Sequence, residues 1–154
     1  MLPIGRIGPR PPVGVDRATG LTKDEQVTMM TLWAISRSPL MIGGDLTSFD
    51  PWTLSLVTNP DVLAVNQRSW GNRVSFDDPD APVWMAHGPG NRSYVALFNL
   101  TDHPRMVEAP LPERKSAALR ARDLWSGGPL ATVEGTLRRS LAPHAAALFE
   151  ILEP

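Results

Sequence analysis

Cysteine is absent from this 154-residue chain, and its absence excludes several kinds of chemistry. Without thiols the chain can form no disulfide framework, no cysteine nucleophile and no cysteine-based metal site. The three histidines, His87, His103 and His144, are too far apart in the sequence to form a local metal-binding motif. We therefore expect neither a metal ion nor any other cofactor.

The sequence also lacks a long apolar run and an excess of charge of one sign. No segment approaches the roughly 20 apolar residues that span a bilayer, and the first residues have no signal-peptide pattern. Fifteen Lys and Arg against sixteen Asp and Glu give a formal charge of -1, which provides no footprint for a phosphate backbone. Neither a membrane nor a nucleic acid is expected as a partner, and the compartment and oligomeric state are left open.

Turn-forming residues, in contrast, are abundant, with sixteen prolines and twelve glycines. The proline- and glycine-rich residues 5–20 show no apolar period and predict an extended loop. Thr22 stands three residues before Glu25 in a capping box, which predicts a helix over about residues 23–37. The apolar arc of this helix is broader than that of a usual surface helix, so a large partner must cover it. Ser38 before Pro39 ends the helix.

Residues 40–43 form a short continuous apolar run, which is typical of a strand buried on both faces of a parallel sheet. Asp50-Pro51 and Asn59-Pro60 each combine an N-cap residue with a proline at the first helical position. Two short helices are therefore expected after this strand, the second over about residues 61–67.

After Gly71 the pattern changes to short β-branched, aromatic and aliphatic runs separated by turn residues. Strands are predicted near residues 73–76, 83–87, 93–100, 105–108, 119–124, 136–141 and 145–152. Seven or so short strands at this spacing indicate an antiparallel β-sandwich. The sequence thus predicts an α/β part over residues 1–71 and an all-β part over residues 72–154. The β part has its own alternating strands and could fold independently.

Asp45, directly after the predicted buried strand, is the main candidate for a functional residue. In α/β barrels such residues collect at the carboxyl ends of the strands. The alternative interpretation is a turn former whose side chain bonds nearby backbone N–H groups, and on sequence alone it is the commoner one. Other candidates are weaker, because His144 fits a turn and most of the five tryptophans fit core positions. Asn91 and Asn99 begin N-glycosylation patterns, the second inside a predicted strand.

The segment MMTLWAISRSPLMIGGDL, followed by LVTNPDVLAVNQ, resembles the late part of the catalytic barrel of a known glycoside hydrolase family. This family contains the α-galactosidases and α-N-acetylgalactosaminidases. The matching residues are Gln26, Leu32, Trp33, Ser38, Pro39, Leu40, Asp45, Leu46, Thr58, Asn59, Val62, Ala64, Val65, Asn66 and Gln67. The resemblance implies the last strand and helices of a (β/α)8 barrel, followed by a C-terminal antiparallel β-sandwich.

The resemblance also implies a retaining glycosidase that acts on terminal α-linked galactosides. Such enzymes use two carboxyl groups roughly 5 to 5.5 Å apart. In the family that the chain resembles, these are an aspartate nucleophile on the fourth barrel strand and an aspartate acid/base on the sixth. Neither position exists in this chain, so no catalytic residue is assigned and the chain alone is expected to be inactive. A galactoside-type carbohydrate is the expected partner if the barrel is complete.

Two substrate-binding residues, Met1 and Asp45, follow from the same resemblance. Family members carry Asp-Met-Leu at the end of the seventh strand, and Met1-Leu2 match its last two residues. The chain is interpreted as a C-terminal piece of such an enzyme, from either a truncated gene or a start codon at an internal methionine. The alternative function is a non-catalytic carbohydrate-binding or interaction module built on the β-sandwich.

Overall fold

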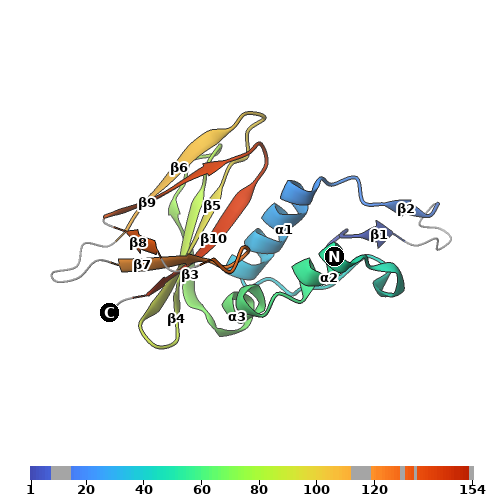
Figure 1. The fold of residues 1–154 in the computed structure, drawn as a ribbon, viewed down its shortest axis with the longest axis horizontal. Coiled ribbons are helices and arrows are strands. Elements are labelled where there is room, and N and C mark those ends of the chain that lie inside the picture. The colour runs from blue at the N-terminus through green and yellow to red at the C-terminus, as the bar shows by residue number, and fades with distance from the viewer. Residues whose placement is uncertain (8–14, 112–118, 129–130, 134, 153–154) are drawn as a thin grey trace.

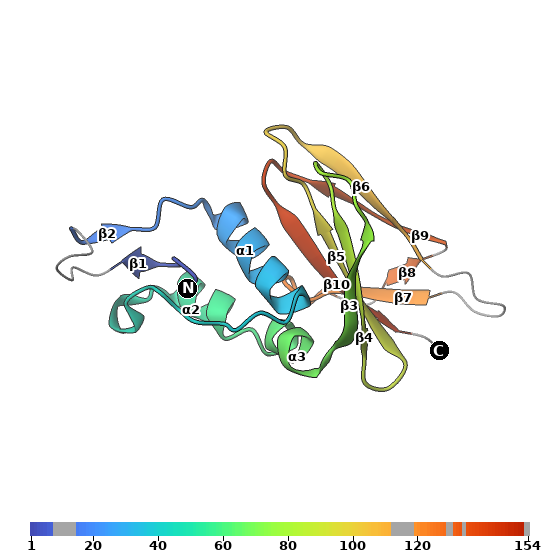
Figure 2. The same ribbon diagram turned by 180° about the vertical axis from the view of Figure 1, so that it is seen from behind.

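The computed structural model describes residues 1–7, 15–111, 119–128, 131–133 and 135–152. A β-sandwich forms one end of the molecule, and a pair of two-residue strands with short helices forms the other (Figures 1 and 2). Helix α1 (Lys23–Ile35) lies between these two ends and contacts both.

Local capping explains where α1 begins and ends. The Thr22 hydroxyl accepts a hydrogen bond from the Glu25 N–H at 3.2 Å, and the Glu25 carboxylate accepts one from the Thr22 N–H at 2.7 Å. The predicted capping box is confirmed. The helix ends two residues earlier than predicted, because Arg37 adopts a left-handed conformation with φ 55° and the Ser38 N–H bonds the Trp33 carbonyl.

The two shorter helices begin at the predicted caps. In α2 (Pro51–Val57) the Asp50 carboxylate accepts the Thr53 N–H at 2.7 Å. In α3 (Pro60–Arg68) the Asn59 side chain accepts the N–H groups of Asp61 and Val62. Each helix has proline at its first turn, where the missing N–H costs no hydrogen bond.

Two predictions for the N-terminal part need correction. The predicted loop over residues 5–20 contains two short antiparallel strands, β1 (Arg6–Ile7) and β2 (Arg17–Ala18), while its residues 8–14 lie outside the described part. The predicted strand over residues 40–43 is reduced to a single parallel bridge between Leu2 and Ile42. Among the described residues only this one neighbour pairs with it, and a ladder needs several successive pairs.

The second half forms an antiparallel sandwich, as predicted, with eight strands in its described part. A six-stranded sheet has the order β3-β4-β5-β10-β7-β8, and β6 pairs with β9 in a second sheet. The strands are β3 (Trp70–Phe76), β4 (Val83–Gly88), β5 (Arg92–Phe98), β6 (Arg105–Pro110), β7 (Leu119–Asp123), β8 (Ala131–Val133), β9 (Thr136–Leu141) and β10 (Ala146–Leu152). Strand β8 was not predicted, since three residues are too short to show alternation.

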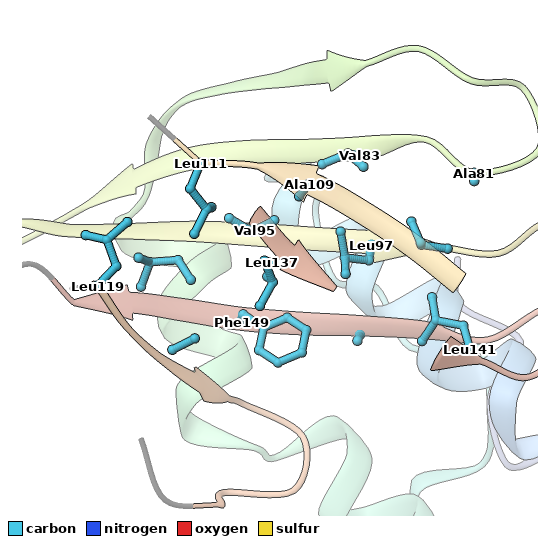
Figure 3. Close-up of a cluster of buried hydrophobic side chains, with 14 of the residues drawn as sticks. Ala81, Val83, Val95, Leu97, Ala109, Leu111, Leu119, Leu137, Leu141 and Phe149 are labelled. Atoms are coloured by element: carbon cyan, nitrogen blue, oxygen red, sulfur yellow. The ribbon is translucent and has the colours of Figure 1, made fainter. Parts of the chain in front are cut away.

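The sandwich core lies between the two sheets. Val95, Leu97 and Phe149 of the larger sheet face Leu137 and Leu141 of the smaller one (Figure 3). These side chains are at most 7% exposed. Burial of each such side chain contributes about 1.5 to 3 kcal/mol.

A second cluster covers the opposite face of the six-stranded sheet and joins the two halves of the chain. Ala34 of α1 and Val62 of α3 pack there against Ala96, Phe98 and Leu148. Strands β5 and β10 are therefore buried on both faces, unlike strands of a free-standing sandwich. The broad apolar arc of α1 has the large partner that it requires.

Candidate functional site

The candidate site is built on two short segments that run side by side in the same direction. The Leu2 N–H donates to the Met41 carbonyl at 2.7 Å, and the Gly43 N–H donates to the Leu2 carbonyl at 2.8 Å. Further along, the Asp45 N–H donates to the Arg6 carbonyl at 2.7 Å. This is the bonding direction of a parallel strand pair, and we call residues 1–6 and 41–45 together the parallel edge.

Met1 and Asp45 both belong to the parallel edge, Met1 at the start of one segment and Asp45 at the end of the other. Met1 is 78% exposed, and its Cβ would be 3.4 Å from a Cβ added to Gly43, two residues before Asp45. The two predicted substrate-binding residues therefore lie on neighbouring segments. Their role in binding a substrate stays a prediction.

Asp45 caps the 3-10 turn η1 (Leu46–Ser48) with one carboxylate oxygen. Its Oδ1 accepts the Thr47 hydroxyl at 2.7 Å and the Thr47 N–H at 3.0 Å. These bonds lower the pKa of Asp45, and the Ser48 hydroxyl and the Arg6 charge lower it further. The turn-former interpretation is correct as far as it goes. Both bonds from Thr47 end on Oδ1, so the cap does not need the second oxygen.

Arg6 and Asp16 belong to the same charged edge and were not singled out by the sequence analysis. Arg6 Nε donates to Asp16 Oδ1 at 2.7 Å in a two-bond ion pair, and this bond and charge lower the pKa of Asp16. The charge of Asp45 acts on both groups. The pairing closes β1 onto β2, ten residues apart, and only the folded chain brings these groups together.

An open hollow of about 420 Å³ lies beside this edge, between the first turns of α1 and α2. Its lining includes Arg6, Arg17, Lys23, Gln26, Asp50 and Trp52. Lys23 Nζ lies 5.0 Å from the centre of the Trp52 ring, and the buried Gln26 bonds the Gly5 N–H and the Leu21 carbonyl. Neither Met1 nor Asp45 lines the hollow. It therefore adjoins the predicted residues without enclosing them.

Two of the other sequence candidates, His144 and Asn99, have structural roles. His144 occupies a turn with φ 55°, and its Nε2 lies 2.7 Å from Asp102 Oδ1. Asn99 is fully buried, and its amide donates to the His103 and Ala142 carbonyls at 2.8 Å, so it is not an accessible glycosylation site. Nowhere in the described ranges do three or more His, Asp or Glu side chains gather to hold a metal ion. No described helix is long and apolar enough to cross a bilayer.

Comparison with known proteins identifies the family of this chain. The family model described as Alpha galactosidase A matches residues 11–68, and the Alpha galactosidase C-terminal beta sandwich domain matches residues 78–151. The chain belongs to the α-galactosidase family. It corresponds to the C-terminal portion of the proteins in that family.

Individual α-galactosidases align with most of this chain. Alpha-galactosidase 2 of Arabidopsis thaliana is 31% identical over 137 residues, which cover 86% of the chain and 35% of the plant protein. The Coffea arabica alpha-galactosidase is 32% identical, with 88% of the chain and 37% of the relative covered. The chain thus spans about a third of the length of these relatives.

A solved structure of a family relative has the same fold. The GH27 β-L-arabinopyranosidase of Geobacillus stearothermophilus is 42% identical, with a TM-score of 0.90, and covers 99% of this chain with 36% of its own. A variant of that enzyme was solved in complex with arabinose. The predicted architecture is confirmed: the chain holds a remnant of the catalytic barrel, followed by the C-terminal β-sandwich.

Proposed function

We propose that this chain forms the closing part of the catalytic barrel, and the attached β-sandwich, of a retaining glycoside hydrolase. Its substrates are carbohydrates with a terminal α-linked galactose or a sugar of the same ring configuration. The observation that carries this proposal is the parallel pairing of Leu2 with Ile42, which places the segments of Met1 and Asp45 side by side. Carboxyl ends of neighbouring barrel strands are where such enzymes bind substrate.

The role proposed for Asp45 is to bind sugar hydroxyls. Its lowered pKa keeps the carboxylate ionised at neutral pH, and an ionised carboxylate accepts hydrogen bonds strongly. A general acid for glycoside cleavage needs the opposite, a raised pKa. The nucleophile and the acid/base are therefore proposed to come from barrel strands other than those in this chain, with Met1 lining the pocket beside Asp45.

The test compares the chain alone with the chain joined to the preceding barrel segment of the Geobacillus enzyme. Both are assayed with 4-nitrophenyl α-D-galactopyranoside and 4-nitrophenyl β-L-arabinopyranoside, whose sugars share a ring configuration and differ by one hydroxymethyl group. We expect no turnover by the chain alone and turnover by the joined protein. Hydrolysis by the chain alone that survives Asp45→Asn but requires another carboxylate would contradict the proposal, as would a folded joined protein without activity.

The joined protein also distinguishes the sugar. A higher kcat/KM for the galactoside supports the α-galactosidase assignment suggested by the plant relatives. A higher value for the arabinopyranoside supports the specificity of the Geobacillus relative. A purely non-catalytic binding module remains the second candidate, and the exposed side chain of Trp70 favours it.

A further inference from the structure

Trp70 differs from the other tryptophans of the chain in its exposure. The chain has five tryptophans, and four of them, Trp33, Trp52, Trp84 and Trp125, pack against buried clusters. Trp70 belongs to none of the clusters in the described part and is 51% exposed. A half-exposed tryptophan keeps an apolar ring face and an N–H group available to a ligand.

The backbone around Trp70 holds its ring in a defined place. Trp70 pairs with His87 across β3 and β4, and the two ring centres lie 6.2 Å apart with an angle of 35° between the planes. The register shifts between Trp70 and Arg73, and Gly71 has φ 64°. A Cβ on Gly71 would lie 3.1 Å from His87 Cδ2. The bulge and the glycine therefore set the place of Trp70 beside His87 on the outer strand of the sheet, and bulges are common beside functional sites.

Polar groups border this ring in an open hollow of about 480 Å³. The hollow is lined by Trp70 and His87 and by the β4–β5 turn with Gly88, Gly90, Asn91, Arg92 and Ser93. Asn91 has φ 56°, which holds the tip of this turn, and its side chain and that of Ser93 form no hydrogen bonds within the described ranges. An aromatic face with a few donors and acceptors around it is the usual composition of a small-molecule site.

Arg92, which lines the hollow, belongs to a balanced network of ion pairs, and this argues against an anionic ligand. Arg92 Nε lies 3.4 Å from Glu150 Oε1, and Arg122 Nη2 lies 3.2 Å from Glu150 Oε2. Arg122 also pairs with Asp61 at 2.9 Å. Two cations and two carboxylates thus neutralise each other. A phosphate or carboxylate ligand needs an uncompensated cation.

We infer that Trp70, His87 and the β4–β5 turn form an accessory binding site for a neutral saccharide, separate from the barrel-end site at Asp45. The C–H face of a pyranose ring is apolar and its hydroxyl rim is polar, so the sugar matches an indole face bordered by amide and hydroxyl groups. The hollow has the volume of a small-ligand site, about 300 to 1,000 Å³. The choice of a galactose-containing ligand rests on the proposed function.

The site can be tested on the full chain by ¹⁹F NMR, with its five tryptophans replaced by 5-fluorotryptophan. The Trp70 resonance is identified by its loss in Trp70→Phe, and the probe is the α-galactosyl disaccharide melibiose. We expect the Trp70 signal to shift and saturate at millimolar sugar, while the signals of the four packed tryptophans stay in place.

Variants then separate recognition from folding. In calorimetric titration with melibiose, Trp70→Ala is expected to weaken binding about tenfold or more, and Trp70→Phe, which keeps an aromatic face, about threefold or less. Phe76→Ala is the matched control, because Phe76 lies on the same strand and is 54% exposed but does not line the hollow. It should change the affinity less than twofold, about the spread expected of independent surface sites.

Three results would overturn the inference. The first is a Trp70 signal that does not move at about 50 mM melibiose or galactose, well above the millimolar range of weak ligands. The second is a shift confined to Trp52, and the third is a Trp70 shift that follows protein concentration instead of sugar, which indicates self-association. The NMR titration needs no catalytic turnover. If Trp70 does not respond to sugar while the joined protein hydrolyses glycosides, the accessory site is rejected and the proposed function is not.

Discussion

At the residue scale, Asp45 caps a turn through Oδ1, and its proposed second role is to bind sugar hydroxyls. Asparagine keeps an oxygen for the Thr47 N–H but removes the charge. In the joined protein we expect Asp45→Asn to lower kcat/KM for the glycoside about 10- to 100-fold, the loss of a charge-assisted hydrogen bond, with little change in Tm. Steady-state kinetics and thermal unfolding measure the two effects.

Asp50→Asn is the matched control for Asp45. Asp50 caps α2 in the same way, through the Thr53 N–H, and asparagine is an equally good cap. Its kcat/KM should stay within about twofold of the parent. Equal losses in both variants would mean that Asp45 acts only on the local structure.

Asn99 is predicted to be structural, despite its place in a glycosylation pattern. Its amide donates to two loop carbonyls, and its Oδ1 accepts the Thr101 hydroxyl at 2.7 Å. Asn99→Ala should lower the free energy of unfolding by about 2 to 4 kcal/mol, because several buried polar groups lose their partners. Urea unfolding measures this, and Asn91→Gly, at an exposed turn with positive φ, should cost less than about 0.5 kcal/mol. Similar costs at both positions would contradict the assignment.

Asp78 gives the stability of the sandwich a predictable dependence on pH. Hydrogen bonding from the Asp80 N–H at 2.9 Å and the Arg105 charge hold its pKa below the ordinary value of an aspartate. A lowered pKa in the folded state means that the stabilisation is present above about pH 4 and is lost as the pH falls through the folded pKa. Tm should therefore decrease as the solution is acidified from about pH 5 to pH 3.

In Asp78→Asn the same acid scan should show a shallower decrease of Tm, because the titrating group is gone while an oxygen for the Asp80 N–H remains. Asp77→Asn, which removes the exposed neighbouring carboxylate, should keep the parent profile. Identical slopes for Asp78→Asn and the parent protein would reject a role for this carboxylate.

At the scale of elements, the parallel edge depends on close approach of the backbone at Gly44. A Cβ added to Gly44 would collide with the Ile4 carbonyl oxygen, so one segment would have to move. We expect Gly44→Ala to lower the free energy of unfolding by about 2 kcal/mol or more and to increase hydrogen exchange at the Asp45 N–H. Gly20→Ala is the control, since no described residue other than its chain neighbours has an atom within 4 Å of its added Cβ. An unchanged Asp45 exchange rate in Gly44→Ala would contradict the pairing.

Helix α1 shows why an element can be predicted from sequence while its neighbours cannot. The capping box is an interaction within a few residues and formed as predicted, whereas the helix ended two residues before the predicted stop. The breadth of the apolar arc predicted that something large covers it. Met30 packs with the N-terminal segments and Ile35 with the sandwich, a division that depends on how distant segments fold together.

At the scale of the whole molecule, the two halves share one core and several hydrogen bonds. Trp125 Nε1 donates to Thr31 Oγ1 at 2.9 Å, and Asn59 Nδ2 donates to the Leu124 carbonyl at 3.0 Å. The division at residues 71 and 72 stays a prediction about domain organisation. The shared cluster argues that it does not separate two independent folding units.

A fragment of residues 72–154 tests this coupling. Without α1 and α3, one face of the six-stranded sheet exposes Ala96, Phe98 and Leu148. We expect the fragment to bind a hydrophobic dye such as ANS and to lose a cooperative thermal transition, as states without fixed packing do. A sharp transition with a Tm near that of the full chain would show that the sandwich is autonomous.

The sequence by itself determined the helix caps, the change from helical to strand patterns near Gly71, and the family-type residues that include Asp45. These features depend on contacts within a few residues or on chemical identity. The tertiary structure decided which faces are buried: α1 and α3 cover the sheet, Arg6 meets Asp16, and Trp70 remains exposed beside His87. Such pairings join residues that are distant in the chain. Their partners follow from the burial of all apolar faces together, which no local pattern contains.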